Sequence, residues 1–303
     1  MKTTIPLILL LSLAVAPATA ATPIDESRPL AADGRVAIDN LKGRILVRTW
    51  DRNEVRVSGS LGEGVERLAI DGGAGSLSIR VIYPQSRGGL FNWWGGSDRG
   101  GPSNIEVRVP VRAEVVAQGV SADIDIEGVR GRRLEAKTVS GKIRAEGAPE
   151  EAEFNAVSGS LDLQLEGSSV TAGTVSGTVT LQGSPGGRIT VETVSGSIAV
   201  SAGEVRRLDA STVSGSLRLK VDRLARDARI GAETLSGGID LILPRDSSAR
   251  LSVSTFSGDI RSEVGEVKRP RHGPGSSLEA RLGDGDGDVR LESFSGTVRV
   301  RLE

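Results

Sequence analysis

The chain has 303 residues, enough for two ordinary domains or for one elongated repeat protein. Its 40 glycines, 3% aromatic content and single His favour the repeat protein, because turn-forming residues are abundant and large core side chains are scarce. With 38 basic and 39 acidic residues the formal net charge is -1, which argues against a protein that binds nucleic acid through overall positive charge.

Residues 1–20 are predicted to be a secretory signal peptide. Lys2 gives a positive start, residues 5–15 are almost wholly apolar, and Ala18-Thr19-Ala20 supplies the small residues of a cleavage site. A retained membrane anchor is the alternative, but a spanning helix needs roughly 20 apolar residues. We therefore expect export to the periplasm, the cell surface or the medium, with no transmembrane anchor after cleavage. The chain has no cysteine, so its stability must come from burial and backbone pairing rather than disulfides.

Residues 21–34 are predicted to form a flexible N-terminal segment, and residues 35–118 are predicted to form irregular coils. Alternating apolar residues over 55–57, 68–70, 77–81 and 105–109 indicate strands, because alternate side chains of a strand point to the same face. A glycine-rich loop that contains three aromatic residues, 86–103, interrupts this part of the chain.

Residues 119–303 are predicted to form regular repeats of a β-solenoid. The first residues of a recurring Ser-Gly step are Ser140, Ser158, Ser176, Ser195, Ser214, Ser236, Ser257 and Ser295, and Ser121-Ala122 is a variant of it. Successive steps lie 18 to 22 residues apart, except for 38 before the last. Each unit carries two short strands, and strands of neighbouring coils pair at about 4.8 Å. The predicted fold class is therefore all-β: a single-stranded β-solenoid, or β-helix, with coils of about 19 residues and an irregular N-terminal third.

Counting from each Ser as position 0 predicts which side chains face inward. Positions -6, -4, +3 and +5 are apolar in nearly every repeat, and position -1 is always Val, Leu or Phe. We assign all five positions to the interior, with a bend at the Ser-Gly step, where glycine tolerates unusual dihedrals. Taking Lys42 as position 0 extends this assignment to Leu41 and its neighbours. The threonines at position -2 are assigned to the outer surface, where hydroxyls form ladders.

Residues 263–287 match no repeat and are predicted to be an insertion before the final coil. Residues 276–282 and 288–293 are predicted to pair as a hairpin across the Gly283–Gly287 turn. Such a hairpin would lie against the last coil and shield the open end of the solenoid from edge-to-edge association.

Three sequence patterns together resemble the bacterial "putative adhesin" domain family: the recurring TVSGS and TVSGT strings, the NLKGRILVRTWDRNEV run that begins at Asn40, and the IEVRVPVRAEVVAQGVSADIDIEG passage that begins at Ile105. The resemblance covers residues 35–303 and depends on many coils rather than one motif. It implies an envelope protein built from strand-rich coils, and it implies no catalytic residues. Unlike tethered relatives, this chain shows no transmembrane segment after the expected cleavage.

The glycine-rich loop carries the first candidate site, because Phe91, Trp93 and Trp94 gather there in a chain otherwise poor in aromatic residues. Exposed rings would contact a carbohydrate, a protein or a lipid surface. The alternative is that the loop folds back and the rings cap the N-terminal end of the solenoid.

A weaker candidate is a calcium loop at Asp284, Asp286 and Asp288, since alternating carboxylates can supply hard oxygen ligands. The match to an EF-hand is incomplete, because Val289 stands where a glycine is needed and Ser295 where a bidentate Glu is needed. A tight hairpin turn explains the same residues. The single His272 lies in a basic loop with no visible catalytic or metal-binding partners and is predicted to be solvated.

Two functions from different classes remain. The first is a non-catalytic, adhesin-like scaffold or binding module of the cell envelope, which contacts an envelope glycan or protein. The second is a polysaccharide-acting β-helix enzyme, a lyase or hydrolase, which would need paired carboxylates, or a carboxylate with an Arg, on one face. Charges alternate in sign from coil to coil and no acidic pair stands out, so we predict a protein that is not an enzyme, with no cofactor and no nucleic-acid partner.

Overall fold

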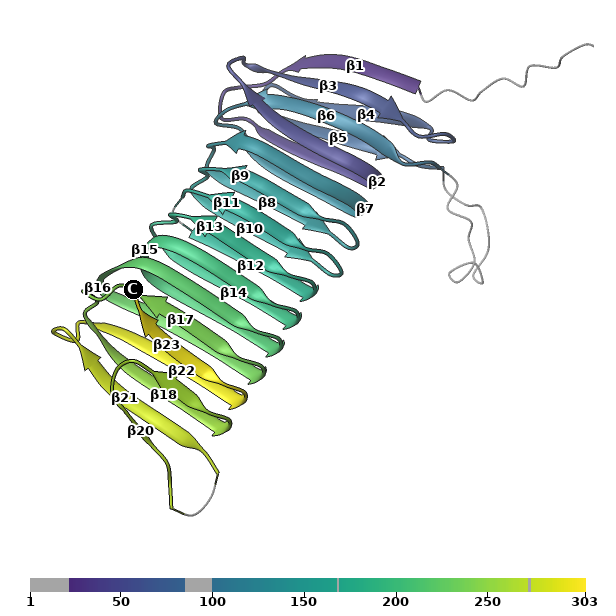
Figure 1. The fold of residues 1–303 in the computed structure, drawn as a ribbon. Coiled ribbons are helices and arrows are strands. Elements are labelled where there is room, and N and C mark those ends of the chain that lie inside the picture. The colour runs from purple at the N-terminus through teal and green to yellow at the C-terminus, as the bar shows by residue number, and fades with distance from the viewer. Residues whose placement is uncertain (1–21, 85–99, 168, 272–273) are drawn as a thin grey trace, which may run out of the picture.

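The computed structural model describes residues 22–84, 100–167, 169–271 and 274–303, and every regular element within them is a β-strand. The strands stack coil upon coil into one elongated solenoid (Figure 1). Apolar side chains fill a single continuous interior that runs the length of the stack. The all-β solenoid predicted from the repeats is therefore confirmed.

The strands fall into three groups along the chain. Those of the N-terminal part are β1 (Thr22–Pro29), β2 (Arg35–Trp50), β3 (Glu54–Leu61), β4 (Arg67–Gly73), β5 (Ser76–Ile82), β6 (Ser103–Pro110) and β7 (Glu114–Val129). Those of the regular coils are β8 (Arg133–Thr138), β9 (Ile143–Gly147), β10 (Glu151–Ala156), β11 (Leu161–Leu165), β12 (Ser169–Ser176), β13 (Val179–Gly183), β14 (Arg188–Ser195), β15 (Ile198–Ser214), β16 (Leu217–Ser236), β17 (Ile239–Leu243), β18 (Ala249–Ser257) and β19 (Ile260–Ser262). Those of the C-terminal part are β20 (Glu266–Lys268), β21 (Ser276–Leu282), β22 (Gly287–Ser295) and β23 (Val298–Leu302).

Neighbouring coils pair in parallel, with equivalent repeat positions directly opposite each other. In β11, for example, Leu161 at position +3 lies between Ile143 of β9 and Val179 of β13. All three side chains are at most 1% exposed. Identical positions therefore stack into columns, and positions -6, -4, +3 and +5 form the interior in the regular coils.

Position -1 was assigned to the interior, and the structure shows that this assignment is wrong. Val139 and Val213 at this position are 45% and 47% exposed, and Leu41 is 46% exposed. The position that completes the interior is -2, where Thr138 and Thr212 are only 4% and 6% exposed, so the outer-surface assignment of the threonines is wrong as well. The reason is that the strand alternation of positions -6 and -4 continues through -2 before the chain turns, which leaves the next side chain outside.

The glycine after each Ser is required by the close stacking of the corners. A Cβ atom added to Gly196 would lie 1.8 Å from the carbonyl oxygen of Gly177 on the preceding coil, and one added to Gly215 would lie 1.7 Å from that of Gly196. No side chain fits at such distances. The Ser-Gly step is thus a corner, as predicted, and the approach of neighbouring backbones explains why glycine occupies it.

Some of the buried threonines have no hydrogen-bond partner, and Thr212 is one of them. We expect Thr212→Val to stabilise the protein by about 1 kcal/mol, because valine has the same shape and removes an unsatisfied buried hydroxyl. Thermal and urea unfolding would measure the change. The matched control is Thr138→Val, which removes a hydroxyl that donates a hydrogen bond to the carbonyl oxygen of Ala122 at 3.2 Å. Equal effects of the two substitutions would contradict the prediction.

The N-terminal end of the stack is covered by antiparallel strands (Figure 1). Strand β1 pairs with β3 over its full length, β3 pairs with β6, and β6 continues in parallel onto β2. The flexible segment predicted for residues 21–34 is therefore wrong for residues 22–29, which form β1. Leu30 is 1% exposed and belongs to the core. These strands give the first coil a neighbour, which is why this third of the chain departs from the regular repeat.

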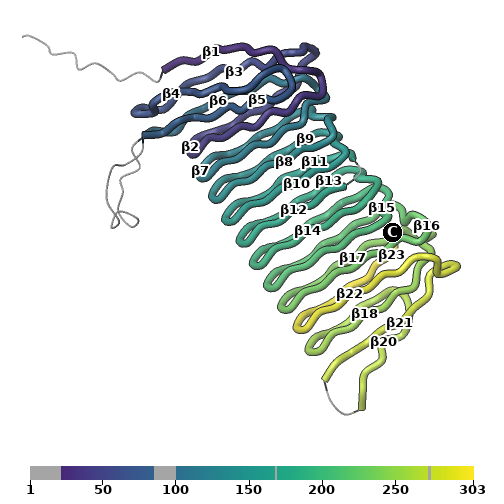
Figure 2. Tube along the Cα trace, turned by 180° about the vertical axis from the view of Figure 1, so that it is seen from behind, coloured from purple at the N-terminus to yellow at the C-terminus, as the bar shows by residue number. Residues whose placement is uncertain are grey.

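The last coil in sequence is not the last coil in space. Strand β22 pairs in parallel with β16 on one side and β18 on the other, and β23 lies in the same way between β17 and β19 (Figure 2). Residues 287–302 are thus intercalated between two coils that precede them in the chain. The solenoid ends with β18 and β19, followed by β21 and β20.

The predicted hairpin of residues 276–282 with residues 288–293 is wrong. Strand β21 and strand β22 lie on opposite edges of β18, the first antiparallel to it and the second parallel. The Gly283–Gly287 turn does reverse the chain, with Gly285 N–H donating to the carbonyl oxygen of Leu282 at 3.0 Å. However, the reversed chain passes to the far side of β18 instead of pairing with the strand it has just left.

Candidate binding surface

An exposed line of apolar side chains runs along one corner of the solenoid. It contains every large hydrophobic side chain that is exposed among the described residues, and each is 44–54% exposed. In spatial order these residues are Leu41, Val120, Val139, Val157, Val175, Val194, Val213, Leu235, Phe294 and Phe256. We call this line the apolar rail, and each of its ten residues a rung.

The repeat itself generates the apolar rail. Each rung occupies position -1, just before a Ser-Gly corner, and parallel in-register pairing places it above the rung of the previous coil. Because paired strands lie about 4.8 Å apart, ten rungs extend over about 43 Å. The rail is therefore straight, narrow and as long as the stack of paired coils.

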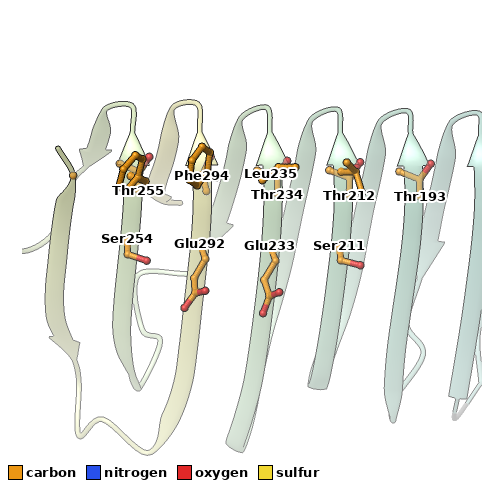
Figure 3. A pocket seen from close by; sticks show the side chains of 14 residues that line it. Thr193, Ser211, Thr212, Glu233, Thr234, Leu235, Ser254, Thr255, Glu292 and Phe294 are labelled. Atoms are coloured by element: carbon orange, nitrogen blue, oxygen red, sulfur yellow. The ribbon is translucent and has the colours of Figure 1, made fainter.

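The C-terminal end of the rail borders a shallow groove (Figure 3). The rings of Phe256 and Phe294 stack there with centroids 4.8 Å apart and planes at 10°. Glu233 and Glu292 lie directly opposite each other on β16 and β22, and both line the groove. Arg290 forms an ion pair with Glu292. This end combines the largest apolar side chains of the rail with two carboxylates.

A second hollow borders the opposite end of the rail, beside Leu41 and Val120. Tyr83 forms one wall, and its hydroxyl donates to the side-chain oxygen of Asn40 at 2.9 Å. The amide of Asn40, which is 1% exposed, donates in turn to the carbonyl oxygen of Ser103 at 2.8 Å. These bonds hold the wall in place. Burial raises the pKa of the neighbouring Asp39 carboxyl, and the charge of Arg80 opposes that rise.

Charge is distributed unevenly along the two sides of the rail. Positions -3, 0 and +2 flank each rung. Beside the first three rungs these positions hold the cations Lys42, Arg44, Lys137 and Lys142 and the anions Asp39 and Asp123. Beside the last three rungs they hold the anions Glu233, Glu292 and Asp259 and no cation. The rail thus runs from a mainly basic end to an acidic end.

Many charged side chains of the solenoid, including some beside the rail, pair with one another. Glu135, whose side chain is 11% exposed, accepts from Lys137 at 2.7 Å and from Arg133 at 3.0 Å. The hydrogen bond from Lys137 holds the pKa of Glu135 below its ordinary value of 4.5, burial opposes this, and the hydrogen bond from Arg133 assists it. Asp125 lies between Arg44 at 2.7 Å and Arg144 at 3.2 Å. Such pairs neutralise the faces of the solenoid and do not resemble a catalytic acid and base.

The Glu135 network predicts a loss of stability in acid. A carboxyl whose pKa is lowered by folding contributes stability above its unfolded pKa, and this contribution disappears as the pH falls through the folded pKa. We expect Glu135→Gln to lower the melting temperature at pH 7 and to have a smaller effect below about pH 4. Melting curves between pH 3 and pH 7 would measure this. Glu127→Gln is the control, because that carboxylate is 53% exposed and its pair with Arg48 is screened.

The residues predicted to form sites are not brought together by the described structure. Phe91, Trp93 and Trp94 lie outside the described residues, and so does His272. Asp284, Asp286 and Asp288 are exposed, and the backbone N–H of Asp286 donates to the hydroxyl of Ser248 at 3.3 Å. In the part of the chain that the structure describes, no three His, Asp or Glu side chains are placed to hold a metal ion.

The apolar rail was missed by the sequence analysis although its signal was present. Position -1 is invariably apolar, and apolar character by itself predicts burial. The uninterrupted alternation of positions -6, -4 and -2, which includes the threonines, was the evidence against that assignment. An apolar column out of phase with this alternation indicates a contact surface.

Comparison with known proteins finds one family model that matches part of the chain. Residues 164–301 match the family model of Toastrack DUF4097, which confirms for this segment the resemblance seen in the repeats. No curated protein matches the chain. Among the described residues no helix is long and apolar enough to cross a membrane.

Several solved structures are similar at low identity. A putative adhesin from Bacteroides fragilis is 12% identical, with a TM-score of 0.42 over 93% of this chain and 98% of that one. A putative adhesin from Parabacteroides distasonis is 11% identical, with a TM-score of 0.41 over 92% and 97%. A putative lipid binding protein from the same species is 14% identical, with a TM-score of 0.39 over 93% and 97%. Scores this low support no argument about function.

Proposed function

We propose that this chain, whose residues 164–301 match the family model of Toastrack DUF4097, is a non-catalytic, adhesin-like binding module of the bacterial cell envelope. The apolar rail carries the proposal, because it is a continuous apolar surface on a solenoid whose other exposed side chains are polar or small among the described residues. Export through the signal peptide predicted at residues 1–20 would place the module in the periplasm, on the cell surface or in the medium.

The extent of the rail supports a contact function. The ten residues of the rail together expose about 900 Å², backbone atoms included, since a fully exposed Val, Leu or Phe residue has roughly 160–220 Å² of surface. The largest apolar patch on a typical monomer is about 300–600 Å². In ten coils an apolar residue occupies position -1, where the alternation of the strand directs its side chain to water. Contact with a partner would bury these side chains, whereas the isolated solenoid leaves them exposed.

The second candidate, a polysaccharide-acting β-helix enzyme, is favoured by one observation. Glu233 and Glu292 are neighbours in an open groove beside Phe294, which is a combination that can hold a sugar. A glycosidase, however, needs one carboxylic acid kept protonated by burial. Glu233 is exposed, and Glu292 is paired with Arg290. The arrangement fits sugar contact better than acid and base catalysis.

The test of the proposed function compares two triple variants of the same three coils. The rail variant carries Val175→Ser, Val194→Ser and Val213→Ser. The control carries Thr180→Ser, Ala199→Ser and Arg218→Ser, all at position +4 on the second strand. We expect purified protein to bind isolated cell-envelope fractions, and the rail variant to lose at least tenfold in affinity while the control does not. Equal binding by both variants would refute the role of the rail.

Two further measurements separate the alternatives. Binding that is lost in a Trp93→Ala, Trp94→Ala variant would support the aromatic loop as the contact site, whereas unchanged binding would leave the rail as that site. Turnover of any cell-envelope polysaccharide by the purified chain, abolished by Glu233→Gln, would support the enzyme and overturn the non-catalytic proposal.

A further inference from the structure

We propose that the partner of the apolar rail is a second copy of this chain, packed rail against rail with the two solenoids antiparallel. This inference rests on the proposed function of the rail as a contact surface, and it adds the identity and orientation of the partner. Three features of the rail support it: its area, the position of its two hollows and the charges along its sides.

The area of the rail is that of a protein–protein interface. A stable complex buries about 800 Å² on each partner. The ten rungs expose about 900 Å², and the polar residues beside them would add a rim. A small ligand would cover only a few rungs. A straight surface about 43 Å long requires a partner that is equally long and straight, and a second solenoid with the same rung spacing meets that requirement.

The two ends of the rail differ in shape in a complementary way. The C-terminal end presents the largest side chains of the rail, Phe294 and Phe256, each more than half exposed. The N-terminal end presents the hollow beside Leu41 and Val120, which is walled by Tyr83. Antiparallel packing brings the phenyl rings of each copy to the hollow of the other. Parallel packing would place rings against rings and would leave the hollow of each copy without a ring.

The charges along the sides of the rail favour the same orientation. Beside the first three rungs the flanking positions hold four cations and two anions, and beside the last three they hold three anions. In an antiparallel pair the same side of both rails meets, so Lys137 of one copy approaches Glu233 of the other and Arg44 approaches Asp259. Parallel packing would place Glu233 and Glu292 opposite position +2 of the second copy, Gly238 and Thr297, where there is no cation. Rim charges of this kind set orientation more than affinity, since several are already paired within their own chain.

Full overlap of two antiparallel rails fixes which rungs meet. Val175 of one copy lies against Val194 of the other, so that the two-fold axis passes between these rungs. Val139 lies against Leu235, and Leu41 lies against Phe256. A slip by one rung, about 4.8 Å, would leave an apolar rung of each copy in water.

The first experiment measures association. We expect sedimentation of the purified chain to show a concentration-dependent dimer, and Val175→Lys with Val194→Lys to weaken it at least 100-fold. The control, Thr180→Lys with Ala199→Lys, places the same charges on the same coils at position +4 and is expected to dimerise normally. Circular dichroism melting would establish that both variants are folded. A monomer at every concentration, or a dimer unaffected by the rail lysines, would overturn the proposal.

The second experiment measures orientation and uses the absence of native cysteine. Val139→Cys and Leu235→Cys chains are prepared separately, mixed and oxidised. Antiparallel packing predicts a disulfide between the two different variants and none within either variant alone. Disulfides between identical variants would indicate parallel packing and would refute the antiparallel arrangement.

The outcomes distinguish this inference from the proposed function. A chain that is always monomeric, but whose serine rail variant loses envelope binding, would refute the second copy and leave the binding module supported. A chain that dimerises through the rail, but whose serine variant binds envelope normally, would refute the rail as the envelope contact and support the second copy.

Discussion

Replacing Leu217 with Asp is expected to abolish the cooperative folding of the central coils. Leu217 is 1% exposed and lies between Ile198 and Ile239 of the neighbouring coils. A carboxylate there would be buried without a partner, which destabilises a protein by about 5 kcal/mol or more. Since each coil is stabilised chiefly by its two neighbours, the loss of one central coil divides the solenoid and exposes two new ends.

The matched control is Arg218→Asp, the next residue along the same strand. Its side chain is exposed, so the same new charge should shift the melting temperature by only a few degrees. Circular dichroism melting and urea unfolding would measure both variants. A Leu217→Asp chain that melts like the control would show that position +3 does not face the interior.

The interior could be predicted where apolar residues recur with the period of a strand. Positions +3 and +5 predicted that Ile198 and Val200 are buried, and position -6 predicted the same for Leu208. All three are at most 2% exposed. Position -1 could not be assigned by hydrophobicity alone. By hydrophobicity Val194 should face the interior in preference to Thr193. Thr193 is the buried one, because the alternation of the backbone decides the direction of each side chain.

The order of the coils could not be predicted from the repeats. Every coil presents the same backbone edges and the same apolar columns, so that any coil can stack on any other. Residues 287–302 fit between β16 and β18 because their backbone pairs in register on both sides, with Asp288 opposite Arg229 in β16 and opposite Arg250 in β18. The interval of 38 residues before Ser295 indicated an insertion. It did not show that the chain turns back after that insertion.

The binding surface could not be predicted from the sequence for the same reason. A residue such as Val175 has no unusual chemistry, and its importance comes from its stacking with equivalent residues of other coils. The rail passes from Leu235 through Phe294 to Phe256, so that its most apolar end depends on the intercalated coil. The stacked rings of Phe294 and Phe256 lie 59 and 21 residues after Leu235 in the chain, and only the stacking order makes all three consecutive rungs.

Replacing Leu291 with Asp is therefore expected to unfold more than the coil that contains it. Leu291 is fully buried in β22, between Ala232 of β16 and Val253 of β18. If that coil is lost, β18 and β19 lose their only parallel neighbours among the described strands. Hydrogen exchange should then lose protection over residues 249–302 while residues 105–200 stay protected, because distant coils keep both of their neighbours.

The exchange pattern tests the observed order against stacking in sequence order. Were the coils stacked as they follow in the chain, residues 287–302 would form the outermost coil, and Leu291→Asp would leave residues 249–262 protected. The control, Glu292→Gln, changes the next side chain of β22, which points outward to Arg290, and should leave exchange unchanged. Retained protection over residues 251–257 in the Leu291→Asp chain would mean that β18 can close directly onto β16. In that case the intercalated coil would be dispensable for the fold, and what it adds to the molecule would be the Phe294 rung of the rail.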